Sequence, residues 1–265
     1  MSFSAEPPTR SIWSGRISIG LVNVPVKIFT MVRDRSFSFK LVRRSDACPI
    51  KYVRVCSRDG ATVEWSEIAK AYEVKKGEYV IFSQEELGAI TPESDKKIKI
   101  DKFVPISSVN DIYYDRTYIL APEENARDSY SLMLSALRDM SMAAVGKFTL
   151  RTKDHPVLIQ AYEEALILRT LRYGYEVVDP IDIEVLYGLP EPSESELELA
   201  YQIIENLSDE FDITEFEDSF RERVEELIEK KMKGETIKIE EEPKTEEVKE
   251  LMAALQATLQ QLQVQ

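Results

Sequence analysis

The sequence has few of the residues on which most enzymes depend. Among 265 residues it contains one histidine, His155, and two cysteines, Cys48 and Cys56. A single histidine excludes an HExxH zinc site, and two cysteines eight positions apart make neither a zinc knuckle nor a disulfide framework. The nine glycines form no GxxxxGKS/T phosphate loop, no GxGxxG turn and no GxSxG elbow. We therefore expect no catalytic residue, no metal and no cofactor.

Long hydrophobic runs are also missing. No apolar stretch approaches the roughly 18 residues of a membrane helix, and no signal peptide opens the chain. The sequence therefore predicts a soluble, cytoplasmic protein. Hydrophobic residues make up 43% of it, which is enough for a sizeable core, and its length indicates one large domain or one domain with an appendage.

The charge is unevenly distributed along the chain. The formal net charge is −14, which taken alone argues against a polyanionic partner. Residues 1–179 hold 26 Lys and Arg against 24 Asp and Glu, whereas residues 180–265 hold 8 against 24. The first 58 residues carry 11 basic and 3 acidic side chains. A basic N-terminal region thus precedes an acidic C-terminal third.

Apolar residues alternate with polar ones over much of the first two thirds of the chain, as in half-buried strands. The Asp59-Gly60 turn favours a hairpin that leads to Trp65. Many short strands suggest an antiparallel barrel or sandwich, so the predicted fold class is mainly β with some α. The expected strands span residues 16–22, 26–32, 36–44, 51–57, 78–83, 97–104, 111–121, 146–152, 155–161 and 164–173.

Helical spacing and capping signals predict the helices. A capping box at Ser83 opens a short helix, and residues 125–141 form a longer one. Ser193 caps a helix to about residue 207, and Thr214 caps another that continues to Lys233, with Gly234 as its stop signal. The expected domains are a core of residues 1–190, a helical arm over 191–234, a linker over 235–244 and an amphipathic helix over 245–265.

Basic side chains in the strands and turns are the candidate DNA contacts. Phosphates offer the same contacts at every sequence, so a binder that ignores sequence needs cations rather than a recognition helix. On composition alone, an ordinary solvated surface explains these residues equally well, and His155 is better explained by a structural or surface role. The candidates are Arg16, Lys27, Arg33, Arg35, Lys40, Arg43, Arg44, Lys51, Arg54, Arg58, Lys147, Arg151 and Lys153.

The end of the chain is a second candidate site. Residues 251–265 contain no charged side chain and follow a charged linker, with Leu251, Met252, Leu255 and Leu259 on one helical face. Such a helix binds a partner or packs on its own domain. A partner is the favoured alternative.

The sequence from Ser11 to Lys27, SIWSGRISIGLVNVPVK, resembles the opening signature of prokaryotic Ku proteins. The similarity continues through SFSF at 36–39, YVRVC at 52–56, FVP at 103–105, YILAP at 118–122, GKFTLRT at 146–152 and LRY at 171–173. It covers most of residues 10–235. The stretch ELMAALQATL at 250–259 is similar to a short C-terminal element of bacterial members.

This resemblance implies a non-catalytic, homodimeric protein of non-homologous end joining. Its β-barrel and a bridge shared by two subunits would form a ring around a DNA end, and helical arms would wrap the partner subunit. An ATP-dependent DNA ligase would be recruited through the C-terminal helix, at the nucleoid. The chain lacks a further cysteine near Cys56 and a Lys-rich tail, so we expect neither zinc at that hairpin nor extra DNA contacts from a tail.

Two other functions stay open. A β-barrel that binds another protein would carry the same basic residues as solvated surface. A carboxylate-dependent nuclease is the third alternative, although the carboxylates lie mainly at helical spacing in the acidic C-terminal third.

Overall fold

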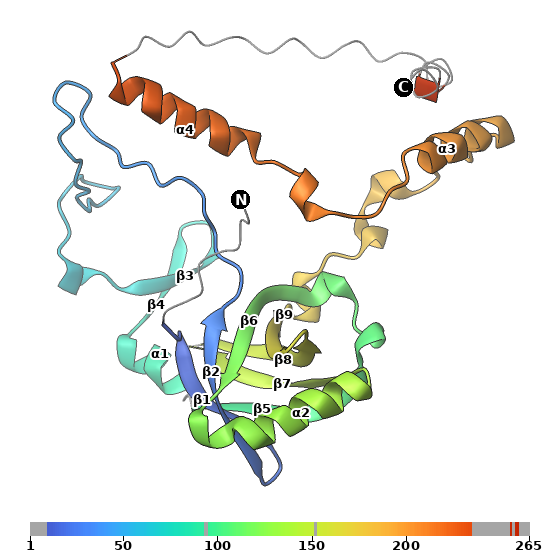
Figure 1. The fold of residues 1–265 in the computed structure, drawn as a ribbon. Coiled ribbons are helices and arrows are strands. Elements are labelled where there is room, and N and C mark those ends of the chain that lie inside the picture. The colour runs from blue at the N-terminus through green and yellow to red at the C-terminus, as the bar shows by residue number, and fades with distance from the viewer. Residues whose placement is uncertain (1–9, 93–94, 151–152, 235–254, 256–257, 260–265) are drawn as a thin grey trace. The chain divides into compact units, whose positions relative to one another are not determined.

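The fold is described from a computed structural model that covers residues 10–92, 95–150 and 153–234, together with residues 255, 258 and 259. The chain divides into two compact units, residues 1–179 and 180–265. The first unit contains a closed seven-stranded barrel (Figure 1). Its strands are β1 (Trp13–Ile19), β2 (Val22–Thr30), β5 (Lys97–Pro105), β6 (Tyr114–Pro122), β7 (Met142–Leu150), β8 (Lys153–Tyr162) and β9 (Ala165–Leu171).

The strand order around the barrel is β1-β2-β6-β9-β8-β7-β5, and β5 closes onto β1. Six neighbouring pairs are antiparallel, whereas β1 and β5 are parallel. A ring with an odd number of strands cannot alternate direction all the way round. The predicted barrel is thus confirmed, but the prediction that it is wholly antiparallel is wrong at this junction.

Alternating side chains fill the barrel. Ile17, Val26, Ile98 and Phe148 are almost completely buried, and the residues beside them on each strand point outward. The helix α2 (Arg127–Asp139) contacts β7 and β8 and adds its buried residues to the same core. Its Tyr130 hydroxyl donates a 2.6 Å hydrogen bond to the Leu120 carbonyl and accepts one from the Leu166 amide. These bonds tie α2 to two barrel strands.

β5 and β7 approach too closely for a side chain at one point. A Cβ atom on Gly146 would lie 1.8 Å from the carbonyl oxygen of Lys99, which is backbone and cannot turn away. Glycine at this position therefore allows β7 to pair with β5 in the register that places Lys99 opposite Lys147.

The segment between β2 and the next strand departs from the prediction. The strands expected at 36–44 and 51–57 are absent, and only the isolated bridges Val42–Pro49 and Val55–Thr62 form there. Phe39 is 70% exposed and Tyr52 81%, so much of the apolar side of this alternation is open to solvent in the single chain. The turn itself is confirmed, because Gly60 has a φ of +74° and its amide donates to the Cys56 carbonyl.

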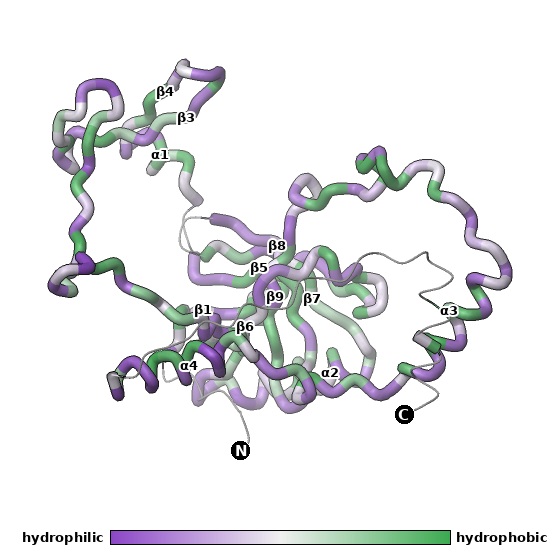
Figure 2. The backbone as a smooth tube through the Cα atoms, turned by 90° about the horizontal axis from the view of Figure 1, so that it is seen from above, coloured by the Kyte–Doolittle hydropathy of each residue, from purple (hydrophilic) through white to green (hydrophobic). Residues whose placement is uncertain are grey.

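A separate two-stranded sheet follows, made of β3 (Lys70–Lys75) and β4 (Glu78–Phe82). β3 was not predicted. Figure 2 shows hydrophobic positions in both strands, although all of their residues except Phe82 are exposed. The helix α1 (Gln84–Ile90) begins with the predicted capping box between Ser83 and Glu86.

The second unit holds two helices in its described part. α3 (Glu194–Asn206) begins at the predicted Ser193 capping box. α4 (Ser219–Met232) begins four residues later than predicted, because the side chain of Asp218 caps it, whereas Thr214 lies in a 3-10 turn held by Asp212. The predicted linker 235–244 lies outside the described residues. None of the helices described is both long and apolar enough to span a membrane.

Candidate nucleic-acid interface

Five basic side chains form a row across the outside of the barrel, here called the outer stripe. The row runs over four adjacent strands in the order β2, β1, β5 and β7. Each member has buried core residues beside it on its strand, so each points away from the core. The outer stripe consists of Lys27, Arg16, Lys97, Lys99 and Lys147.

The strand register brings these cations together. Arg16 pairs with Lys97 across β1 and β5, and Lys99 pairs with Lys147 across β5 and β7. Neighbouring strands lie about 4.8 Å apart, so the stripe spans about 14 Å from β2 to β7. A DNA duplex carries one negative charge per about 1.7 Å of its axis. The outer stripe is therefore long enough to face several phosphates.

Like charges that lie directly opposite each other in a sheet reduce stability. One nearby carboxylate offsets part of this repulsion, since Asp95 lies 3.1 Å from the Lys99 ammonium and 4.0 Å from that of Lys97. An anion bound along the stripe would offset more of it. The arrangement thus fits a site for an extended anion better than a purely structural role.

Most other predicted contacts lie on the segment between β2 and β3 rather than on the barrel. They do not join the outer stripe within one sheet, and all are solvent-exposed. This group comprises Arg33, Arg35, Lys40, Arg43, Arg44, Lys51, Arg54 and Arg58.

Arg43 and Arg54 of this group have local partners. The Arg43 guanidinium donates two hydrogen bonds to the Asp46 carboxylate, and the bond from its Nε atom measures 2.9 Å. That contact raises the pKa of Arg43 and lowers the pKa of Asp46. The guanidinium carbon of Arg54 lies 4.4 Å from the ring centroid of Trp65. Arg43 is thus the weaker candidate for a phosphate contact.

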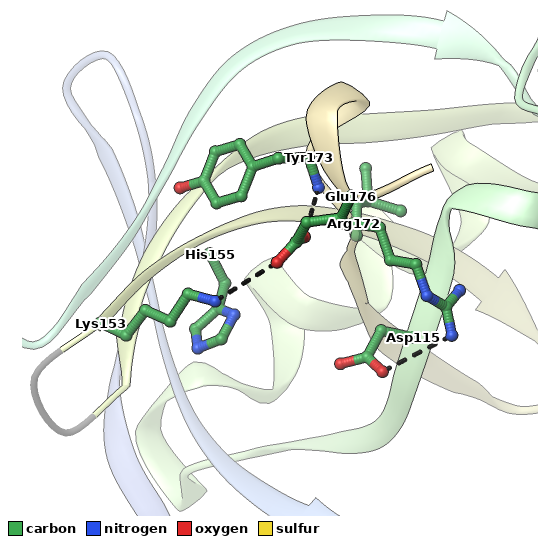
Figure 3. A pocket seen from close by; sticks show the side chains of 7 residues that line it. Asp115, Lys153, His155, Arg172, Tyr173 and Glu176 are labelled. Atoms are coloured by element: carbon green, nitrogen blue, oxygen red, sulfur yellow. Dashed lines mark hydrogen bonds and ion pairs between the residues drawn. The ribbon is translucent and has the colours of Figure 1, made fainter. Parts of the chain in front are cut away.

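Lys153 lies apart from the stripe, in a polar pocket of about 230 Å³ (Figure 3). Its ammonium is 3.6 Å from the Glu176 carboxylate, and Arg172 is 3.7 Å from that of Asp115. The Tyr173 hydroxyl donates to the Asp154 carbonyl. The pocket thus balances its cations with carboxylates, which would repel a phosphate.

His155 lines the same pocket and is partly buried. Burial lowers the pKa of its imidazole, and the positive charge of Lys153 lowers it further. A neutral histidine adds no positive charge to the pocket at pH 7. Arg151, which precedes this strand, lies outside the described residues.

The C-terminal candidates are described only in part. Leu255 is partly buried and Leu259 is 6% exposed, both in helical conformation, whereas Leu251 and Met252 lie outside the described residues. Cys48 and Cys56 are free thiols, and no group of three potential ligands able to hold a metal ion occurs among the residues described.

Two members of the stripe, Lys97 and Lys99, were not predicted as DNA contacts from the sequence. Both lie in a strand that it did predict, at the outward positions on either side of Ile98. The alternation Lys-Ile-Lys-Ile was the available signal. It was insufficient because only the pairing of β5 with β1 and β7 brings these lysines beside Arg16 and Lys147.

Comparison with known proteins gives a consistent result. The family model described as "Ku70/Ku80 beta-barrel domain" matches residues 18–199. The chain is 34% identical over 257 residues to "Non-homologous end joining protein Ku" of Heliobacterium modesticaldum, covering 97% of this chain and 93% of the relative. The protein of the same name from Archaeoglobus fulgidus is 35% identical over 251 residues, covering 95% and 98%. That of Bacillus subtilis is 29% identical over 255 residues, covering 94% and 81%.

Proposed function

Because this chain belongs to the prokaryotic Ku family of non-homologous end joining proteins, we propose that it binds the ends of double-stranded DNA without reading their sequence. Members of this family are non-catalytic. The observation that carries the proposal is the outer stripe, a row of five cations that crosses four strands of the barrel. Phosphates present the same charge at every sequence, so such a row holds any duplex.

The placement of the cations supports binding that ignores sequence. Base edges are usually read by a helix or a two-stranded ribbon that enters the major groove. α1 and α3 contain no Lys or Arg. In α4, Arg221 and Lys230 are paired with Glu225 and Glu226 at 3.0 and 3.3 Å. α1 and α3 thus offer no cation to a groove, whereas the barrel strands carry the five cations of the outer stripe.

We propose further that two copies close a ring around the DNA. The sheet of β3 and β4 supports this, because an isolated two-stranded sheet is marginally stable in water and this one exposes apolar side chains. A second copy would cover them. In the second unit Tyr201, Phe211 and Phe220 are also more than half exposed, as expected of an arm that packs on another subunit.

We assign one role to each of the four regions predicted from the sequence. Residues 1–190 would form the core that holds DNA, residues 191–234 the arm, and residues 235–244 a linker. The helix over 245–265 would recruit an ATP-dependent DNA ligase through Leu251, Met252, Leu255 and Leu259. An uncharged amphipathic helix after a charged linker fits a groove on a partner protein.

A comparison of linear and closed-circular DNA of the same sequence tests the ring. A ring can thread only onto an end, so we expect much tighter binding to the linear form in a gel-shift titration at moderate salt. Equal affinity for both forms would overturn the threading proposal. A complete lack of binding to a short blunt duplex would instead favour the barrel as a protein-binding module.

Deletion of residues 245–265 tests the ligase contact. We expect the truncated protein to bind DNA ends as the full chain does but to lose its stimulation of a cognate end-joining ligase. The pair of substitutions Leu251→Asp and Leu255→Asp should have the same effect. The matched control Gln260→Asp should have none, because helical spacing in the sequence predicts that residue 260 falls off the apolar face. Reduced DNA binding by the truncated protein would show that the helix serves the core instead.

A further inference from the structure

Trp65 is an exposed tryptophan with a cation fixed on one of its faces. The side chain is 68% exposed, and the guanidinium carbon of Arg54 lies 4.4 Å from its ring centroid. A small hairpin holds the two together, because the Val63 amide donates to the Arg54 carbonyl at 3.0 Å and the Cys56 amide to the Ala61 carbonyl at 2.8 Å. Arg54 and Trp65 thus form a preformed pair, here called the Arg-Trp pair.

The Arg-Trp pair has no role in the core. The other tryptophan of the chain, Trp13, packs edge-on against Phe148 at 5.0 Å and lines the barrel core. Trp65 instead begins a short 3-10 turn in which no residue is buried. Leaving an indole in water is unfavourable by the hydrophobic effect, and its exposed area indicates a surface that a ligand covers.

Local charge favours a nucleic acid over a second copy as that ligand. Residues 31–65 carry eight Lys and Arg but four Asp and Glu. A second copy of the same segment would bring the same positive excess and be repelled, whereas a polyanion is attracted. The segment therefore differs from the β3–β4 sheet, whose apolar side chains fit a protein partner.

We propose that the Arg-Trp pair is a stacking site for an unpaired nucleobase, so that the protein binds the single-stranded overhang of a DNA end. The bases of an intact duplex are stacked on each other and offer no free face, whereas an unpaired base can stack on the indole face opposite Arg54. Aromatic stacking with a nearby arginine is the common basis of single-strand binding without sequence preference. This inference rests on the proposed end binding and adds the type of end preferred.

The substitution Trp65→Ala tests the site by affinity. A duplex with a single-stranded tail of about eight thymidines is compared with the blunt duplex. We expect Trp65→Ala to weaken binding to the tailed duplex about tenfold and to leave the blunt duplex unchanged, since one stacked base contributes about that much. Trp65→Phe should retain most of the affinity. Tyr162→Ala, which removes an exposed aromatic residue from the barrel, is the matched control and should change neither.

Fluorescence gives an independent measurement, because the chain contains two tryptophans. In a Trp13→Phe variant the emission comes from Trp65 alone. We expect the tailed duplex to quench this emission and the blunt duplex to leave it nearly unchanged.

Three results would overturn the stacking site. One is equal affinity of the wild-type protein and Trp65→Ala for the tailed duplex. The second is an equal loss on both duplexes together with a loss of dimer mass, which would place Trp65 in a subunit interface. The third is the absence of quenching. If the wild-type protein bound neither duplex, the proposed end binding itself would fail, which is a distinguishable outcome.

Discussion

Replacement of Arg16, Lys99 and Lys147 by glutamine should weaken DNA-end binding by at least about a hundredfold at physiological salt. These residues lie on three adjacent strands of the outer stripe, and a dimer would lose six phosphate contacts. Each contact contributes about 0.9 to the slope of log K against log salt, so the slope should become shallower by about five. Titrations at several salt concentrations measure both quantities.

Stability separates this effect from misfolding. Lys99 and Lys147 lie directly opposite each other, so removing their charges relieves a repulsion in the sheet. We expect the melting temperature of the triple variant to stay the same or to rise. The matched control replaces Lys230, Lys231 and Lys233 near the end of α4 by glutamine, which removes equal charge from a helix without the stripe. Weaker binding with an unchanged salt slope would contradict the assignment of the stripe to phosphates.

The barrel strands could be predicted because the pattern that identifies them lies in consecutive residues of the sequence. Ile17, Val26 and Phe148 are buried while Arg16, Lys27 and Lys147 beside them are exposed, and this alternation is visible in the sequence. The parallel contact between β1 and β5 could not be predicted, because it joins segments about 80 residues apart and depends on the strand order of the whole barrel. The same long-range pairing completes the outer stripe, which explains why Lys97 and Lys99 were missed.

In segment 31–65, by contrast, strands were predicted that do not form. Phe39 and Tyr52 alternate with polar residues as in a half-buried strand, yet they are exposed in the single chain. The single chain leaves these two side chains largely open to solvent. Strands do not form at 36–44 and 51–57, and the exposed side chains there agree with the proposal that DNA covers part of this segment at Trp65.

The net charge of −14 was also a poor guide to function. Most of the acidic excess falls in residues 180–265, whereas the cations of the outer stripe lie between Arg16 and Lys147. Charges on a solvated surface are largely screened beyond about 8 Å at physiological salt. Binding of a polyanion thus depends on the local surface and not on the sum over the chain.

The β3–β4 sheet should control the subunit association. Tyr72 lies directly opposite Val80, and both are exposed apolar side chains on the same face of the sheet. The paired substitution Tyr72→Lys and Val80→Glu replaces this apolar contact by an opposite-charge pair, which keeps the two strands together. A two-fold interface contains the Tyr72–Val80 contact twice, once from each subunit. If each contact contributes about 2 kcal/mol, losing both would raise the dimer dissociation constant about a thousandfold.

Sedimentation equilibrium over a range of concentrations measures this change. We expect the wild-type protein to be a dimer and the paired variant a monomer that melts at the same temperature, because the barrel core is untouched. The control Leu132→Lys alters a side chain on α2 that is 73% exposed, and it should leave the dimer intact. The monomer should also lose the preference for linear over circular DNA, since one subunit cannot close a ring, while its outer stripe still gives salt-dependent binding to both forms. A variant that stays dimeric would exclude this sheet face from the subunit interface.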